Sequence, residues 1–127
     1  MDAPALAITD LRFAYRGIRP EDSFELLVPE LRLAPGEQVL LTAGSGRGKS
    51  TLLALIAGLL EPAGGRVKVA GQDIHGARAG ARDRFRGRNI GMIFQTFNLL
   101  HGFTALENVM AALKFSTLPR SEHRSRA

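Results

Sequence analysis

The feature that most restricts the fold is a glycine-containing loop between an apolar run and a leucine-rich segment. Residues 40–53 read LLTAGSGRGKSTLL. An apolar run, a glycine loop, a Lys-Ser-Thr triplet and leucines in this order predict a strand, a phosphate-binding loop and a helix. In such a loop the backbone N–H groups and the positive end of the helix face an anion. The sequence therefore predicts an α/β fold with a phosphate site where a strand gives way to a helix.

The loop departs from the usual pattern at its first position. The pattern G-x-x-x-x-G-K-[ST] begins with glycine, whereas this chain has Ala43 there. A Cβ costs about 1–2 kcal/mol if the position needs a positive φ, and almost nothing if the backbone is still strand-like. Because Gly44 follows and can absorb a distortion, we expect Ala43 at negative φ and an intact loop.

The residue types of the loop suit a nucleoside triphosphate and magnesium. Glycines let the backbone approach phosphate oxygens, Lys49 is expected to reach the β- and γ-phosphates, and the Ser50 hydroxyl is expected to bind Mg²⁺. Thr51 is expected to cap the helix or contact the α-phosphate. The alternative is an ordinary glycine-rich turn without a ligand. The residues expected to bind ATP in this segment are Gly44, Ser45, Gly46, Arg47, Gly48, Lys49, Ser50 and Thr51.

Strand-like alternation before the loop predicts two antiparallel strands, at residues 7–15 and 23–34, separated by a turn region at 17–22. A turn at 35–37 leads into a short apolar run at 38–42, which predicts a buried strand. Apolar residues at helical spacing then predict a helix over residues 50–60.

Further elements are expected after the loop. Residues 66–74 predict a strand with a bend at Gly71, the arginine-rich segment up to Gly87 predicts a weak helix or a loop, and residues 89–95 predict a second buried strand. Thr104 and Glu107 have the spacing of a capping box and predict a helix. The polar residues after Pro119 suggest the first turns of another helix.

Composition excludes several classes of site. The chain has no cysteine, which excludes a disulfide, a zinc–thiolate site and a thiol nucleophile, and its longest apolar run, residues 52–60, is too short to span a membrane. The three histidines lack metal-ligand spacing and are expected in loops or at the surface. These features together favour a cytoplasmic protein.

A formal net charge of +5 raises nucleic acid as a partner. The excess arginines gather in residues 78–88 and 120–126, and only Phe85 supplies an aromatic ring there. Single-strand binding usually needs aromatic residues interleaved with the charges. A solvated basic face is therefore the favoured interpretation, and no nucleic acid is expected.

Two segments resemble the ATP-binding subunits of ABC transporters. Residues 43–74 are similar to the Walker A loop, helix and following strand, with departures at Ala43 and at Gly44, where proline is usual. Residues 88–109, RNIGMIFQTFNLLHGFTALENV, resemble the Q-loop region. The sequence of this region most resembles subunits of the lipoprotein-releasing and macrolide-export type, although methionine importers share part of it. The resemblance implies a P-loop NTPase core of the ABC ATPase type with an antiparallel β subdomain.

The resemblance also implies roles outside the loop. Gln95 would be the Q-loop glutamine that contacts Mg²⁺ or the attacking water, and its alternative is a polar cap on a strand. Tyr15 would stack on adenine, and its alternative is packing in a core or on a sheet face. Residues Phe97–Phe103 would contact a transmembrane permease subunit. A second ATP-binding subunit is the other expected partner, with the protein held at the inner face of the membrane through the permease.

Some parts of the family pattern are absent from these residues. We find no LSGGQ signature, no Walker B strand ending in Asp-Glu and no switch histidine. The chain is therefore expected to be the N-terminal half of such a subunit, truncated before these motifs, marginally stable alone, and poor at binding and hydrolysing ATP.

The expected divisions are an antiparallel β region at 1–37, a Walker A to Q-loop core at 38–95, and the Q-loop with the start of a helical subdomain at 96–127. The expected function is energy coupling in the transport or extrusion of a substrate such as a lipoprotein or a drug. Two alternatives stay open: a basic P-loop ATPase that acts on nucleic acid, and a degenerate nucleotide-binding module.

Overall fold

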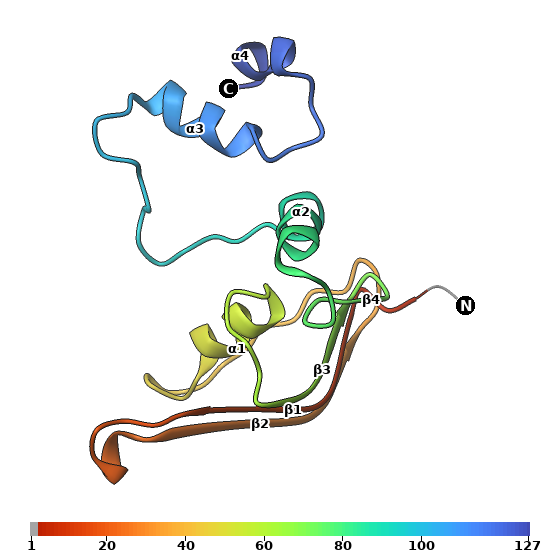
Figure 1. The fold of residues 1–127 in the computed structure, drawn as a ribbon, viewed down its shortest axis with the longest axis vertical. Coiled ribbons are helices and arrows are strands. Elements are labelled where there is room, and N and C mark those ends of the chain that lie inside the picture. The colour runs from red at the N-terminus through yellow and green to blue at the C-terminus, as the bar shows by residue number, and fades with distance from the viewer. Residues whose placement is uncertain (1–2) are drawn as a thin grey trace. The chain divides into compact units, whose positions relative to one another are not determined.

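The computed structural model describes residues 3–127, which form two compact units, residues 3–82 and 83–127. Each unit is described by itself below (Figure 1). The elements are, in order, β1 (Leu6–Tyr15), a 3₁₀ turn (Pro20–Asp22), β2 (Phe24–Leu33), α1 (Lys49–Ile56), β3 (Gly64–Val69), β4 (Gln72–Asp73), α2 (Ala79–Asn89), α3 (Ala105–Leu113), a second 3₁₀ turn (Arg120–Glu122) and α4 (His123–Arg126).

The first unit is built on an antiparallel sheet with strand order β2-β1-β3-β4. β1 pairs with β2 along its whole length, from Leu6 opposite Leu33 to Tyr15 opposite Phe24. A register shift between Thr9 and Arg12 interrupts its pairing with β3. The two strands predicted at residues 7–15 and 23–34, and their antiparallel pairing, are thus confirmed.

The core lies between one face of this sheet and α1, which lies beside the sheet in Figure 1. Ile8, Leu55 and Val67 are fully buried and Leu11 is almost so. Leu6 and Ile8 of β1 face the core by alternation, and the irregular backbone at Asp10 shifts the pattern so that Leu11 faces it next. Leu52 and Leu55, three residues apart in α1, share a helix face. Fully burying an aliphatic side chain contributes about 1.5–3 kcal/mol, so these few residues hold the unit together.

One glycine fixes how closely β1 and β3 approach each other. Gly65 in β3 has φ +86°, and a Cβ there would overlap the backbone of Asp10, itself at φ 48°. Only glycine accepts both the left-handed backbone and this close approach. The register shift of β1 against β3 is therefore built into the sequence.

The buried strand predicted at residues 38–42 is wrong for this structure. No regular secondary structure forms there, and Val39, Leu40 and Leu41 are exposed, Leu40 at 86%. A strand needs a neighbour to satisfy its backbone N–H and C=O groups. Among residues 3–127 no strand pairs with this segment, so its apolar side chains stay uncovered.

The buried strand predicted at residues 89–95 is wrong for the same reason. Asn89 ends α2, residues 90–94 form no regular structure, and Ile93 and Phe94 are exposed. The described residues offer this segment no strand partner. Both errors thus concern apolar segments whose sequence favours burial on both faces of a sheet.

Smaller corrections concern element boundaries. The helix predicted over 50–60 ends at Ile56. The N–H groups of Ala57 and Gly58 then donate to the carbonyls of Leu53 and Leu55. The bend at Gly71 separates two strands, because Ala70 and Gly71 both have positive φ and form the tight turn between β3 and β4. The arginine-rich segment, predicted as a weak helix or a loop, is the helix α2.

The second unit depends on local hydrogen bonds. The predicted capping box is confirmed: the Glu107 N–H donates to the Thr104 hydroxyl, and the Thr104 N–H donates to the Glu107 carboxylate at 2.7 Å. Asn108 accepts from the Leu100 N–H at 2.8 Å and donates to the Phe103 and Thr104 carbonyls. Asn108 thereby fixes the end of the preceding loop against α3. The helix suggested after Pro119 is also present, as α4.

Candidate functional site

The glycine loop forms the N-terminal approach to α1. Gly46 and Gly48 have φ values of +73° and +87°, and Gly48 is the N-cap of the helix. Among the described residues, the non-glycine positions with positive φ are Asp10, Ala70 and Asn98, so Ala43 is at negative φ as expected. The Cβ at Ala43 therefore adds no backbone strain, and the loop keeps its turn.

Lys49 folds back over the loop that precedes it. Its Nζ donates to the carbonyl oxygens of Ala43 and Gly44, both at 2.7 Å. An ammonium group is thus held at the mouth of the loop, while the N–H groups of the first helical turn have no partner within the helix. Both features supply positive charge at the same place, which is the electrostatic requirement of a phosphate site.

Phe24 supports the loop from the sheet, a contact that sequence reasoning missed. A Cβ built on Gly48 would lie 2.5 Å from Phe24 Cζ, so the ring occupies the space beside this glycine. Alternation along β2 turns Phe24 toward the core face, but only the tertiary structure brings it to the loop. Ser50, the residue expected to bind magnesium, is exposed.

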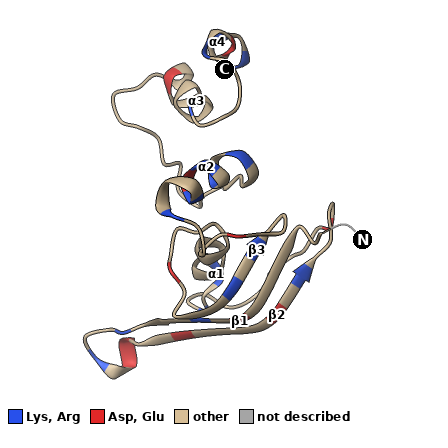
Figure 2. Ribbon diagram, turned by 45° about the vertical axis from the view of Figure 1, so that its right-hand side comes forward, with Lys and Arg blue, Asp and Glu red and all other residues tan. Residues whose placement is uncertain are grey.

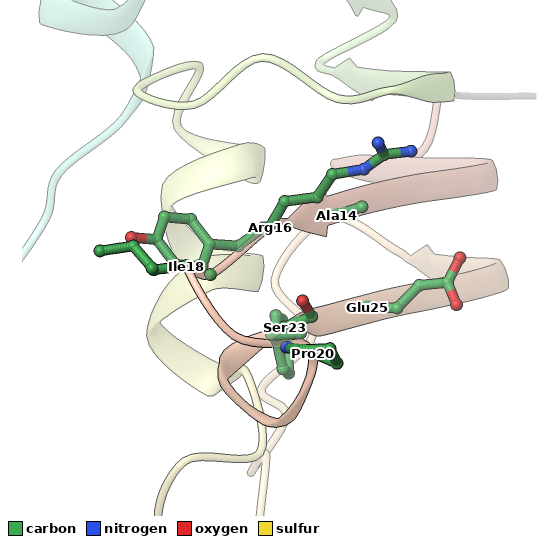
Figure 3. A pocket seen from close by; sticks show the side chains of 9 residues that line it. Ala14, Arg16, Ile18, Pro20, Ser23 and Glu25 are labelled. Atoms are coloured by element: carbon green, nitrogen blue, oxygen red, sulfur yellow. The ribbon is translucent and has the colours of Figure 1, made fainter.

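Tyr15 lies at the end of β1 and is 61% exposed. Packing in a core is therefore excluded, whereas packing on a sheet face and stacking on a ligand both agree with this exposure. Tyr15 lines an open hollow of about 650 Å³ at the β1–β2 connection, where Arg16, Ile18 and Pro20 extend from the connecting loop (Figure 3). Its cross-strand neighbour is Phe24, which touches the glycine loop, so one pair of residues links Tyr15 to that loop.

Gln95 and the segment Phe97–Phe103 belong to the second unit. Gln95 is exposed and lies outside any helix or strand. Phe97, Leu99, Leu100 and Phe103 are exposed as well, which is unusual for four large apolar residues within seven positions. The contact of Gln95 with Mg²⁺ or the attacking water stays a prediction, because Gln95 and the glycine loop lie in different units.

A polar cluster secures the other end of α1. The ring Nε2 of His75 lies 2.9 Å from the Leu55 carbonyl, and its Nδ1 lies 3.3 Å from a Glu61 carboxylate oxygen. Arg82 donates to the same carboxylate, and this hydrogen bond is the largest cause of the lowered pKa of Glu61, followed among the lowering causes by the charges of Arg82 and His75. The cluster connects the end of α1 to the segment after β4.

The expectation that all three histidines lie in loops or at the surface is wrong in part. His123 is 6% exposed, and its Nε2 lies 3.0 Å from the Leu118 carbonyl. His75 lies in the turn after β4, as expected, although its side chain is mostly buried. Each ring reaches a backbone carbonyl, and the Leu55 carbonyl reached by His75 also accepts from the Gly58 N–H at 3.1 Å. Such tertiary contacts follow no sequence pattern.

The loop fits a magnesium-bound nucleotide. The positive-φ glycines leave open space beside Gly46, the Lys49 ammonium is already drawn to oxygen acceptors, and the helix end adds positive charge. Within the first unit, the Ser50 hydroxyl would supply a hard oxygen ligand of the kind that Mg²⁺ prefers, with phosphate and water oxygens completing the shell. Magnesium when bound would neutralise phosphate charge.

Comparison with known proteins agrees with these features. The ABC transporter family model matches residues 28–127. An uncharacterized ABC transporter ATP-binding protein of Mycobacterium bovis is 39% identical over 126 residues, which are 96% of this chain and 37% of the relative. The lipoprotein-releasing system ATP-binding protein LolD of Chromohalobacter salexigens is 37% identical and covers 99% of this chain and 56% of its own length.

A solved structure shares the fold. The dimeric ATP-binding cassette MJ0796 in a post-hydrolysis state bound to ADP and Pi matches with a TM-score of 0.82 and 30% identity, over 95% of this chain and 53% of that one. The chain thus spans about half the length or less of these relatives. Its fold is that of an ABC-type ATPase, in which the described residues supply the antiparallel sheet, the phosphate-loop helix and helices of the second unit. With the family model matching most of its residues, the chain belongs to the ABC transporter family, among its ATP-binding proteins.

Proposed function

We propose that this chain supplies the ATP-binding loop of the energy-coupling subunit of an ABC transporter. The observation that carries the proposal is the pair of 2.7 Å hydrogen bonds from Lys49 Nζ to the Ala43 and Gly44 carbonyls, at the N-terminus of α1. They hold an ammonium group beside unpaired helix N–H groups, where a triphosphate would replace the carbonyls as acceptor.

Each residue has a distinct part in this proposal. The amides of residues 44–49 cradle the phosphates, Ser50 contributes a magnesium ligand, and Thr51 caps the helix or contacts the α-phosphate. Tyr15 stacks on the adenine, which its exposure at the end of β1 allows. Gln95 orients the water or metal with an amide that carries no charge to oppose the phosphates.

The partners are proposed by resemblance and are supported by exposure. The apolar residues of Phe97–Phe103 suit a contact with a permease subunit, since their uncovered side chains gain from burial. A second ATP-binding subunit is proposed because the cassette MJ0796 is described as dimeric. Release of a lipoprotein is proposed from the names of the LolD relatives. A drug as the substrate, and a place at the inner face of the membrane, are proposed from the family resemblance alone. In the described residues no helix is long and apolar enough to cross a membrane.

The test is an equilibrium titration of the chain with Mg-ATP, comparing Lys49→Ala with Lys114→Ala. Removing the Lys49 ammonium should weaken binding by about tenfold or more, because a charge-assisted hydrogen bond to phosphate is lost. Lys114 lies at the C-terminal end of α3, and its removal should leave binding unchanged. A folded wild-type chain that ignores Mg-ATP, or equal affinities for Lys49→Ala and wild type, would refute the proposal.

A further inference from the structure

The face of the antiparallel sheet opposite α1 carries a basic trough that the nucleotide site does not use. Its floor is formed by small residues of β1, because Ala7 and Thr9 point away from the core that holds their neighbours Leu6 and Ile8. The hollow has a volume of about 390 Å³ and is lined by Ala7, Thr9, Arg32, Arg66, Lys68 and Gly71, among others.

The register of the sheet places cations on both sides of this floor. Ala7 pairs with Arg32 of β2 on one side and with Lys68 of β3 on the other. Thr9 pairs in the same way with Glu30 and Arg66. Neighbouring strands lie about 4.8 Å apart, so Arg32 and Lys68 start about 10 Å from each other, a span that two long side chains close around one anion. In Figure 2, blue segments mark Lys and Arg residues on β2 and β3.

The cations retain donors for a ligand. Arg32 pairs with Glu30 at 2.7 Å and Arg66 with Asp73 at 3.2 Å, in each case through Nε, and a guanidinium has further N–H donors on its Nη atoms. Exposed ion pairs of this kind contribute little and are easily exchanged. Within residues 3–127, Lys68 forms no ion pair with a carboxylate.

We propose that this trough binds a single phosphate group, either as the free ion or as a monoester such as a lipid headgroup. Two cations facing each other across Ala7, with the Thr9 hydroxyl and Arg66 beside them, match the several acceptor oxygens of such a group. Glu30 and Asp73 stand at the edges of the trough and repel a longer polyanion, so a nucleic acid does not fit.

The test maps binding of inorganic phosphate by amide chemical shifts of the ¹⁵N-labelled chain, which resolves the trough from the glycine loop. Saturable shifts are expected at residues 7–9 and 66–68. The double variant Arg32→Ala/Lys68→Ala should weaken these shifts by about tenfold, since both facing donors are lost. Ala7→Leu should weaken them as much by filling the floor without changing the charge. Arg12→Ala is the matched control, because Arg12 lies beyond the register shift of the same strand and should change nothing.

A second arm uses phosphatidylcholine vesicles with and without phosphatidic acid. Binding that requires phosphatidic acid and is lost in both trough variants identifies a lipid headgroup, whereas a response to inorganic phosphate alone identifies the free ion. The proposal is overturned if neither probe shifts the trough amides of the folded chain. It is also overturned if Arg12→Ala reduces binding as much as the trough variants do.

Discussion

The antiparallel sheet and the two apolar segments at residues 38–42 and 90–94 differ in where their partners lie. β1 finds β2 through a short connection and finds β3 on its other side, and their shared face is buried. The two segments are similarly apolar, yet Leu40 and Ile93 are almost fully exposed. Antiparallel strands can be joined by short turns, whereas parallel strands need long crossovers. Hydrophobic sequence therefore yields burial only where the same residues also supply a partner.

This difference bears on how the glycine loop is held. The glycine loop follows one of the uncovered segments, but its support in this structure comes from Phe24 of β2 and from α1. The family resemblance implies that strands beside residues 38–42 lie in the remaining length of the relatives, of which this chain covers about half or less. Uncovered apolar edges of this kind promote aggregation.

The largest effect should appear in hydrogen exchange. Amides of β1 and β3 that pair across the sheet should be protected by up to the full free energy of unfolding, while amides of 39–41 and 92–94 should exchange as in an open chain. One experiment measures the exchange rates of both regions, because they belong to the same chain. Strong protection at 39–41 would show that this segment has a partner and would break the comparison.

Truncating a leucine should lower the free energy of unfolding much more in the core than in the exposed segment at residues 38–42. Leu55→Ala should lower the free energy of unfolding by about 2–5 kcal/mol, because Leu55 is fully buried between α1 and the sheet. Leu40→Ala removes the same atoms from an exposed position and should change it by less than about 0.5 kcal/mol. Urea titration followed by circular dichroism measures both. Equal losses for the two variants would contradict the structure.

Substitution of the loop glycines sharpens the role of Phe24. Gly46→Ala should cost about 1–2 kcal/mol through its left-handed backbone alone, since its Cβ would meet nothing. Gly48→Ala has the same strain and also displaces the Phe24 ring, so it should destabilise the chain more. The difference between the two variants in unfolding free energy isolates the contact. It should shrink in a Phe24→Ala background, and an unchanged difference there would remove Phe24 as the support of the loop.

The smallest effect is the loss of the α3 capping box, in the second unit, at low pH. Hydrogen bonds from the Thr104 backbone N–H and then from its hydroxyl lower the pKa of Glu107 below its usual value of 4.5. Because this pKa is lowered, the capping box contributes its full stabilisation of α3 at pH values above the ordinary pKa of glutamate. The contribution is lost as the pH falls through the pKa of Glu107 in the folded chain. Helical chemical shifts of residues 105–108 should decline over that range. In Glu107→Gln the decline should be absent, and an unchanged decline would assign it to another group.

Much of the fold could be predicted because it is local. Alternation fixed β1 and β2, and the Thr104–Glu107 spacing fixed the start of α3. The predictions of strands at 38–42 and 89–95 failed, because an apolar composition does not show whether a neighbouring strand is present. The buried ring of His123 was missed for a related reason, since its partner is a carbonyl that only the folded chain brings near.

The candidate site was predictable in part. The loop residues and Lys49 follow from a motif with a physical mechanism, and the negative φ expected at Ala43, with Gly44 beside it to absorb a distortion, is found. The support by Phe24 depends on tertiary packing and left no pattern to find. Gln95 and Tyr15 rest on family resemblance, and their roles stay predictions.

The most direct test of the central claim is amide chemical-shift mapping of the chain during addition of Mg-ATP. The account predicts saturable shifts at the amides of residues 44–51, where Lys49 already binds two loop carbonyls, and a further shift at Tyr15. A folded chain in which these amides do not respond, while shifts appear only elsewhere, would contradict the claim that this loop is the nucleotide site.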